Sequence, residues 1–127
     1  MLECEKVYIV EETFIRNEDF EGQKGEISLE IKWKTAKNKD EKAKLIKLEL
    51  KAEIGKPENK EIPFYYEIKV NGFFSVEGIK TSEAEEVVKQ EGREILLSFV
   101  RTHLYEYLLR AGISPLVLPN IPNNAKE

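Results

Sequence analysis

The run from residue 46 to residue 54 constrains the fold more than any other part of the chain. Its apolar side chains alternate with charged ones throughout: Ile46, Leu48, Leu50, Ala52 and Ile54 against Lys47, Glu49, Lys51 and Glu53. Successive side chains of a β-strand point to opposite faces, so this run predicts one buried face and one solvated face. Such a strand is typical of an antiparallel sheet that is covered on a single side.

Three more stretches alternate with the same period, over residues 7–14, 27–34 and 62–71. The first is the least regular of them, and the second places Trp33 on its apolar face. Turn and loop signals separate the four stretches, at residues 21–25, 37–42 and 55–59. We therefore predict four antiparallel strands.

The hydrophobic period changes after residue 81. Ser82 and Glu85 have the spacing of a capping box, which predicts a short helix over residues 82–91. A long helix is predicted from Gly92 to Ala111, with Gly112 as its left-handed C-terminal residue. One side of this helix is apolar: Ile95, Leu96, Phe99, Val100, His103, Leu104, Tyr107, Leu108 and Ala111.

The order of these elements predicts the fold class. Because the strands precede the helices, the long helix is expected on the apolar face of the sheet. The prediction is a single α+β domain over residues 1–127, with a four-stranded antiparallel sheet followed by a short and a long helix. The apolar segment 113–122 contains three prolines, so it is expected to lie extended against the sheet or against a partner.

Composition excludes several classes of function. The net charge is −4 and the lysines are interleaved with glutamates, so no nucleic-acid partner is expected. The N-terminus lacks the pattern of a signal peptide, and no apolar run approaches the ~18–20 residues that a membrane helix needs. With Cys4 as the only cysteine, no intrachain disulfide can form, and a cytoplasmic location is the expectation.

The sequence contains no pattern of catalytic or metal-binding residues. His103 is the only histidine, and it falls on the apolar side of the long helix, where a core or interface role is expected. The chain has no phosphate-binding loop and no dinucleotide motif. No enzyme activity, cofactor or metal is therefore predicted.

Aromatic residues gather around the fourth strand: Phe64, Tyr65, Tyr66, Phe73 and Phe74. Phe73 and Phe74 are adjacent, so in an extended backbone one of them must point away from the core. Two interpretations stay open. This surface is covered by the chain's own tail or another subunit, or it forms an open groove for apolar ligand or peptide.

These residues resemble the SecB family of export chaperones. The run 64–79 is similar to the family's aromatic strand and the corner that follows it, and 91–101 resembles the opening of its long helix. The ending 112–119 is similar to the family's Pro-x-Leu-x-Leu tail, and 7–14 to its first strand.

The resemblance implies a SecB fold assembled as a dimer of dimers. It implies an ATP-independent holdase for unfolded or precursor polypeptides, with SecA as a partner in protein export. By position, the side chains that would line a client groove are Phe73, Phe74, Ile79, Leu116 and Leu118, with Tyr65 at its rim. Glu11 and Glu67 would dock SecA, although Ile15 stands where a second acidic residue is expected.

Three alternatives to an export chaperone remain. A SecB-like chaperone of a toxin–antitoxin pair would have an antitoxin as its partner. A small module could instead bind an apolar ligand between the sheet and the long helix. A purely structural subunit would have one fixed partner and would not protect unrelated clients.

Overall fold

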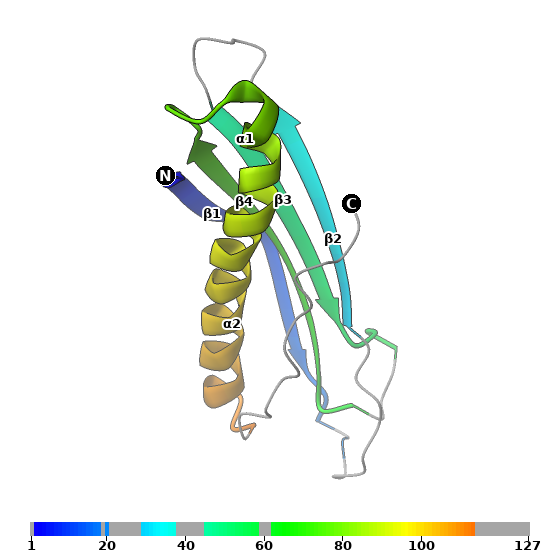
Figure 1. Ribbon diagram of the computed structural model, residues 1–127. Helices are drawn as coiled ribbons and strands as arrows, with labels where there is room; N and C mark the ends of the chain where they lie inside the picture. The colour runs from blue at the N-terminus through cyan, green and yellow to red at the C-terminus, as the bar shows by residue number, and fades with distance from the viewer. Residues whose placement is uncertain (1, 19, 21–28, 38–44, 59–61, 114–127) are drawn as a thin grey trace.

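The structure is a computed structural model that describes residues 2–18, 20, 29–37, 45–58 and 62–113 (Figure 1). In these ranges, four strands come first and a helical segment follows. The strands are β1 (Glu3–Arg16), β2 (Leu29–Lys37), β3 (Leu45–Ile54) and β4 (Phe64–Ser75). The helical segment comprises α1 (Thr81–Val87), a π-helical turn η1 (Val88–Gly92) and α2 (Arg93–Arg110). This order confirms the predicted α+β class.

The strands form one antiparallel sheet in the order β1-β4-β3-β2. In the described part of the chain, β1 and β2 are therefore the edge strands. The register places Ile68 of β4 between Glu12 of β1 and Ala52 of β3. The helical segment runs along one face of the sheet, with α2 over β4 and η1 reaching β3 (Figure 1).

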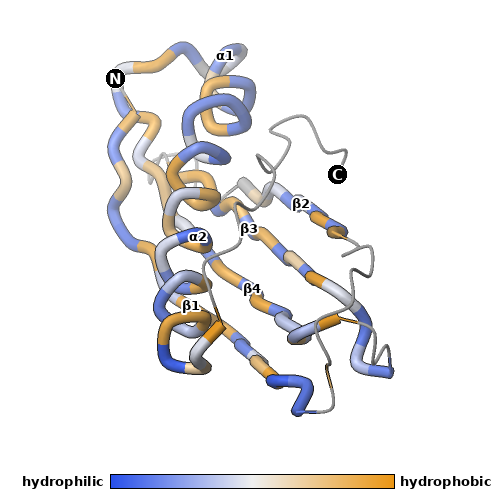
Figure 2. The backbone as a smooth tube through the Cα atoms, turned by 90° about the horizontal axis from the view of Figure 1, so that it is seen from below, coloured by the Kyte–Doolittle hydropathy of each residue, from blue (hydrophilic) through white to orange (hydrophobic). Residues whose placement is uncertain are grey.

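The core lies between that inner face and the helical segment. Its side chains come from the apolar positions of β3 and β4 and from one side of the helix, as the alternation of hydropathy along the strands shows (Figure 2). The largest fully buried side chains are Tyr66, Phe64, Phe74, Leu48, Leu50, Ile62, Ile68, Leu96, Leu97, Leu104, Leu108 and Val70. The period of two in the sequence thus identified the buried face of the central strands.

β1 is longer and less regular than the sequence predicted. It covers 14 residues where the alternation predicted eight, over 7–14. Its register with β4 shifts between Cys4 and Lys6 and again between Ile9 and Glu11. Each extra residue moves the following side chains to the other face, which is why the period of two is poor in this strand. The predicted loop 21–25, residues 38–42 of the predicted loop 37–42 and residues 114–122 of the predicted tail 113–122 lie outside the described residues.

The predicted short and long helices are present as α1 and α2. Val88, Gly92 and Arg93 all have right-handed helical backbone angles, so the chain passes from α1 through one π-helical turn into α2 without a break. The predicted capping box is wrong, because Lys80 is the N-cap and no side chain caps the helix. The Glu85 carboxylate instead accepts a 3.5 Å hydrogen bond from the Thr35 hydroxyl of β2.

The C-terminal end of α2 agrees with the prediction. Gly112 has a φ of 71°, a conformation that favours glycine. The Ile113 N–H donates to the Leu108 carbonyl at 2.9 Å, and the Gly112 N–H donates to the Leu109 carbonyl at 3.2 Å. These two bonds form a Schellman motif, which ends the helix and turns Ile113 toward the core.

Gly72 of β4 is required by close packing under the helix. A Cβ atom at this position would lie 2.9 Å from Leu96 Cδ2 and 2.9 Å from Phe74 Cε2. We expect Gly72→Ala to lower the free energy of unfolding by about 1–3 kcal/mol, because the core must shift to accept a methyl group. Urea unfolding measures this, with Ser98→Ala on exposed α2 surface as the control. An unchanged midpoint for Gly72→Ala would contradict this packing.

Candidate functional site

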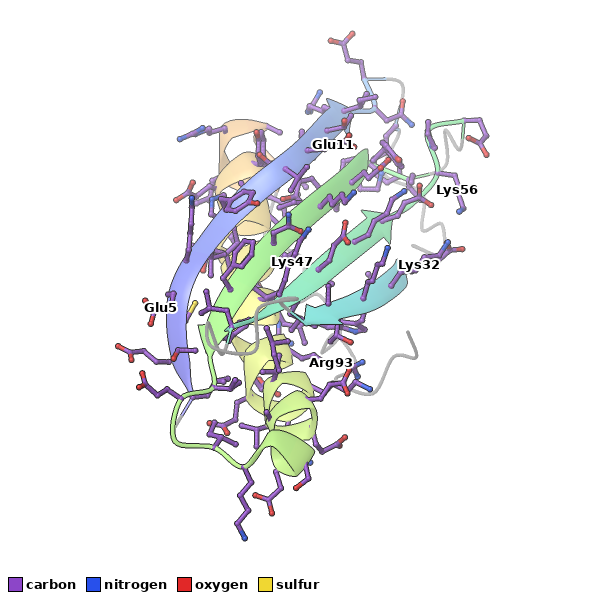
Figure 3. All side chains as sticks on the ribbon, turned by 90° about the horizontal axis from the view of Figure 1, so that it is seen from above. Glu5, Glu11, Lys32, Lys47, Lys56 and Arg93 are labelled. Atoms are coloured by element: carbon purple, nitrogen blue, oxygen red, sulfur yellow. The ribbon has the colours of Figure 1, made fainter. Side chains whose placement is uncertain are left out.

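The outer face of the sheet, which points away from α2, carries rows of like charge. Glu30, Glu53 and Glu67 lie opposite one another across β2, β3 and β4. The next row along the strands is basic: Lys32, Lys51 and Lys69. Figure 3 shows the outer side of the sheet with Glu11, Lys32, Lys47 and Lys56 labelled. Like charges directly across strands repel, so this arrangement weakens the sheet unless other pairs compensate.

Ion pairs between neighbouring rows provide that compensation. Lys69 Nζ lies 2.8 Å from Glu49 Oε1, and Lys51 Nζ lies 3.7 Å from Glu67 Oε1. Lys56 Nζ contacts Glu53 at 2.7 Å and Glu30 at 3.4 Å. The Lys56 ammonium, which donates a hydrogen bond to Glu53, holds the pKa of the Glu53 carboxyl below its ordinary value. These pairs are largely exposed, so each contributes little to stability and the face stays available to a charged partner.

Tyr65 lies within this charged face. Its hydroxyl is 2.6 Å from Glu67 Oε2 and 3.0 Å from Glu53 Oε2, and its side chain is 7% exposed. Burial, together with the two carboxylates, raises the pKa of the Tyr65 phenol. The phenol therefore stays neutral and fixes the two acidic side chains, which leaves little of Tyr65 for a client.

Glu11 and Glu67, the predicted docking residues, lie on the same outer face. Glu11 is opposite Lys69 in the β1–β4 register, and Thr13, two residues further along β1, is opposite Glu67. The two carboxylates thus come from adjacent strands at neighbouring positions. Docking through them stays a prediction.

An aromatic patch interrupts the charged face near the start of β1. It consists of Tyr8 and Phe73 and is named here the Tyr8–Phe73 patch. The two rings stack with centroids 6.1 Å apart, and the Lys6 ammonium lies 5.2 Å from the centre of the Tyr8 ring. Tyr8 is 36% exposed, so this apolar surface is accessible.

A second apolar surface runs along α2 on the side turned away from the sheet. It consists of Ile95, Tyr105 and Leu109 and is named here the α2 ridge. Ile95 and Tyr105 are exposed, and Leu109 is 68% exposed. Sequence reasoning placed Ile95 and Phe99 on one core-facing side, which is wrong for Ile95. The sequence did contain a signal for this exposed surface, because α2 carries apolar residues on both of its sides. That pattern is typical of a helix that is buried on both sides.

A half-buried acidic contact holds β1 against α2. The Glu12 carboxylate accepts hydrogen bonds from the hydroxyls of Tyr66 at 2.7 Å and Tyr107 at 2.9 Å. The Tyr107 ring also stacks on Phe14, with centroids 5.1 Å apart. These contacts fix the position of the C-terminal half of α2, and with it the position of the α2 ridge.

This contact predicts a loss of stability at high pH. Burial and the Glu12 carboxylate raise the pKa of Tyr66 in the folded chain, while tyrosines of the unfolded chain ionise near pH 10. Above about pH 10 the unfolded chain binds fewer protons than the folded one, so stability falls as pH rises. Urea midpoints at pH 8.5 and pH 11 measure the fall. Tyr66→Phe should show a smaller fall, and an equal fall in both chains would contradict the assignment to Tyr66.

The four predicted client-binding residues that the structure describes do not gather in one groove. Phe74 is 0% exposed in the core, so its assignment to a groove is wrong; it points to the inner face and packs under the helix. Phe73 points to the outer face, and Tyr65 lies on that face eight residues away along β4. Ile79 is half-buried against the core in the turn after β4. Leu116 and Leu118 lie outside the described residues.

The described residues also bear on metal and membrane binding. Within the described ranges, no three of the potential ligand side chains His, Cys, Asp and Glu come together as a metal site. His103 Nδ1 lies 3.0 Å from the Phe99 carbonyl oxygen of the preceding turn, and its ring packs on Phe99. None of the helices in the described part of the chain combines the length and apolar character that a bilayer span requires.

Solved structures with a similar fold include the following two. One is the Mycobacterium tuberculosis Rv1957 SecB-like chaperone in complex with a ChAD peptide from the Rv1956 HigA1 antitoxin. It matches with a TM-score of 0.68 and 10% identity, over 95% of this chain and 91% of that chain. The other is a protein of unknown function from Streptococcus agalactiae, with a TM-score of 0.52 and 16% identity, over 95% and 98% of the two chains. At these identities the likeness shows the fold alone.

The sequence comparisons identify the family. A search of curated proteins gives no match. The family model described as preprotein translocase subunit SecB matches residues 3–125, which is nearly the whole chain. The chain therefore belongs to the SecB family.

Proposed function

We propose that this chain is an ATP-independent holdase that binds unfolded polypeptides as a cytoplasmic homo-oligomer. Membership of the SecB family and the fold of a SecB-like chaperone support a chaperone role. The observation that carries the holdase assignment is the pair of exposed apolar surfaces, the Tyr8–Phe73 patch and the α2 ridge. Such surfaces on a soluble subunit indicate contact with other polypeptides.

The α2 ridge is the surface best suited to contact a second copy. It lies on a rigid helix, and its side chains would interdigitate with the same ridge of a copy turned by a two-fold axis. The outer edge of β1, which pairs with no other strand of the described residues, offers backbone groups to another copy as well. A dimer of dimers would use both surfaces and leave the outer face of each sheet accessible.

The outer face then receives the client. Tyr8 and Phe73 supply aromatic surface that no described element covers, and Lys6 and Lys47 lie on the same face. Burying ~100 Å² of apolar surface contributes about 2.5 kcal/mol before ordering costs, so single patches bind weakly. Several patches in one oligomer would hold a chain tightly without requiring a particular sequence.

Two settings fit such a holdase. In protein export, Glu11 and Glu67 on the outer face would dock a basic surface of SecA. In the second setting the client is an antitoxin; this is favoured by the M. tuberculosis SecB-like chaperone, whose structure contains an antitoxin peptide. An apolar small-ligand module is less well supported, because the depression on the outer face is lined by charged residues: Glu30, Lys32, Lys51 and Glu53.

Light scattering of an aggregating test protein checks the holdase assignment. A disulfide-containing protein is reduced to start its aggregation, with or without a stoichiometric amount of this chain. We expect scattering to be suppressed equally in the presence and absence of ATP. Unchanged scattering, or suppression only with ATP, would contradict the proposal.

A further inference from the structure

We propose that the Tyr8–Phe73 patch preferentially binds polypeptide segments in which acidic residues lie on both sides of an apolar residue. This inference rests on the proposed holdase function, whose client surface includes the patch. It adds the chemical class of the bound segment. The apolar side chain would contact Phe73, and the two carboxylates would pair with lysines on the neighbouring strands.

Two lysines flank Phe73 across the sheet. In the register, Lys6 of β1 is directly opposite Phe73 on one side, and Lys47 of β3 is directly opposite it on the other. Lys6 is exposed and Lys47 is half-buried on the outer side of the sheet (Figure 3). The Lys6 ammonium also lies 5.2 Å from the centre of the Tyr8 ring, which places its charge beside the patch. An accessible aromatic surface thus has a cationic side chain on each side.

Lysines outnumber acidic residues in the two cross-strand rows that contain the patch. These rows are Lys6, Phe73, Lys47 and Ala36, and Tyr8, Asn71, Glu49 and Lys34. The single carboxylate, Glu49, is already held by Lys69 of the next row, whose Nζ lies 2.8 Å away. That hydrogen bond, with the charges of Lys47 and Lys34, keeps the pKa of the Glu49 carboxyl below its ordinary value. The patch is therefore locally basic, although the chain carries a net charge of −4.

The acidic row of the outer face is too far away to neutralise these lysines. Glu53 follows Lys47 by six positions along β3, which is roughly 20 Å at ~3.4 Å per residue. This separation is about twice the Debye length at physiological salt, so the attraction between exposed groups is largely screened. Glu53 is also paired with Lys56 at 2.7 Å. The lysines at the patch thus keep their charge available for a ligand.

The spacing of the two lysines matches an extended peptide that crosses the strands. Neighbouring strands lie ~4.8 Å apart, so the backbones of Lys6 and Lys47 are about 10 Å apart across β4. An extended chain covers about 10 Å in three residues. Acidic residues three positions apart, with an apolar residue between them, would therefore place one carboxylate near each lysine and the apolar side chain over Phe73. The flexible lysine stems tolerate small differences in register.

Three peptides of equal length test this preference. They share leucine, phenylalanine and serine and differ only at paired positions three apart, which carry aspartate, asparagine or lysine. Each has blocked termini and an uncharged fluorophore, whose anisotropy gives the dissociation constant. We expect the aspartate peptide to bind about 5- to 10-fold tighter than the asparagine peptide at low salt, the contribution of two exposed ion pairs. The lysine peptide should bind weakest, and added salt should reduce the differences.

A pair of double variants locates the effect. Lys6→Gln combined with Lys47→Gln should abolish the advantage of the aspartate peptide and leave the affinity for the asparagine peptide unchanged. Lys32→Gln combined with Lys89→Gln removes the same charge away from the patch, and should keep the advantage. All four side chains are at least partly exposed, so equal urea midpoints are expected for both variants and the wild-type chain.

The outcomes separate this inference from the function on which it rests. If none of the three peptides shows saturable binding, the holdase function itself is wrong. Equal affinities for the aspartate and asparagine peptides, or an advantage that survives the loss of Lys6 and Lys47, would overturn the acidic preference alone. A single-stranded oligonucleotide that displaces the aspartate peptide at a lower concentration than unlabelled peptide does would show a nucleic-acid site, and would also overturn it.

Discussion

Phe74→Ala lowers the free energy of unfolding by about 3–5 kcal/mol, the range for truncating a buried phenylalanine. Phe74 is fully buried, and its ring packs against the positions of Gly72 and Gly92 beneath the helix. The truncation leaves a cavity between the end of β4 and the helical segment, which the two glycines cannot fill. Urea unfolding followed by circular dichroism measures the loss.

Phe73→Ala is the matched control, one residue away on the opposite face of β4. It should change the free energy of unfolding by less than about 1.5 kcal/mol, because the side chain is only half-buried. It should instead weaken client binding, since it removes half of the Tyr8–Phe73 patch. Two results would show that the patch is not a client surface. One is a loss of unfolding free energy for Phe73→Ala as large as that for Phe74→Ala, and the other is unchanged client affinity of Phe73→Ala.

The second large effect concerns assembly. Replacing both Tyr105 and Leu109 with serine should raise the dissociation constant between subunits on the order of 100-fold, because each subunit loses two apolar side chains from the contact. Both residues are exposed, so the fold itself should persist. Sedimentation velocity over a range of concentrations measures the shift.

Glu86→Ser is the control for assembly, because Glu86 is exposed on α1 and away from the α2 ridge. It should leave the mass unchanged. A double variant that assembles like wild type would assign the α2 ridge to another partner.

The fold was predicted from the sequence where one physical pattern dominates. In β3, burial on one face alone enforces strict alternation, so the buried residues could be assigned individually. In β1 two register shifts break the alternation, and the strand's ends were missed. The sequence predicted two helices that meet at Gly92, and the structure joins them through a π-helical turn that the apolar spacing does not reveal.

The candidate site was harder to predict because it depends on which face each residue takes. The adjacent Phe73 and Phe74 showed that one ring must point outward, but not which one. The partner of Phe73, Tyr8, lies 65 positions earlier in the chain and comes beside it only through the β1–β4 register. Trp33 was assigned to the apolar face of its strand, and the structure buries it there.

The mass of the native assembly, with and without an unfolded client, tests the central claim most directly. Light scattering coupled to size-exclusion chromatography gives both masses. The account predicts a homo-oligomer that gains the mass of a client when the unfolded chain is added and does so without ATP. A monomer whose mass does not change in the presence of the unfolded chain would contradict it.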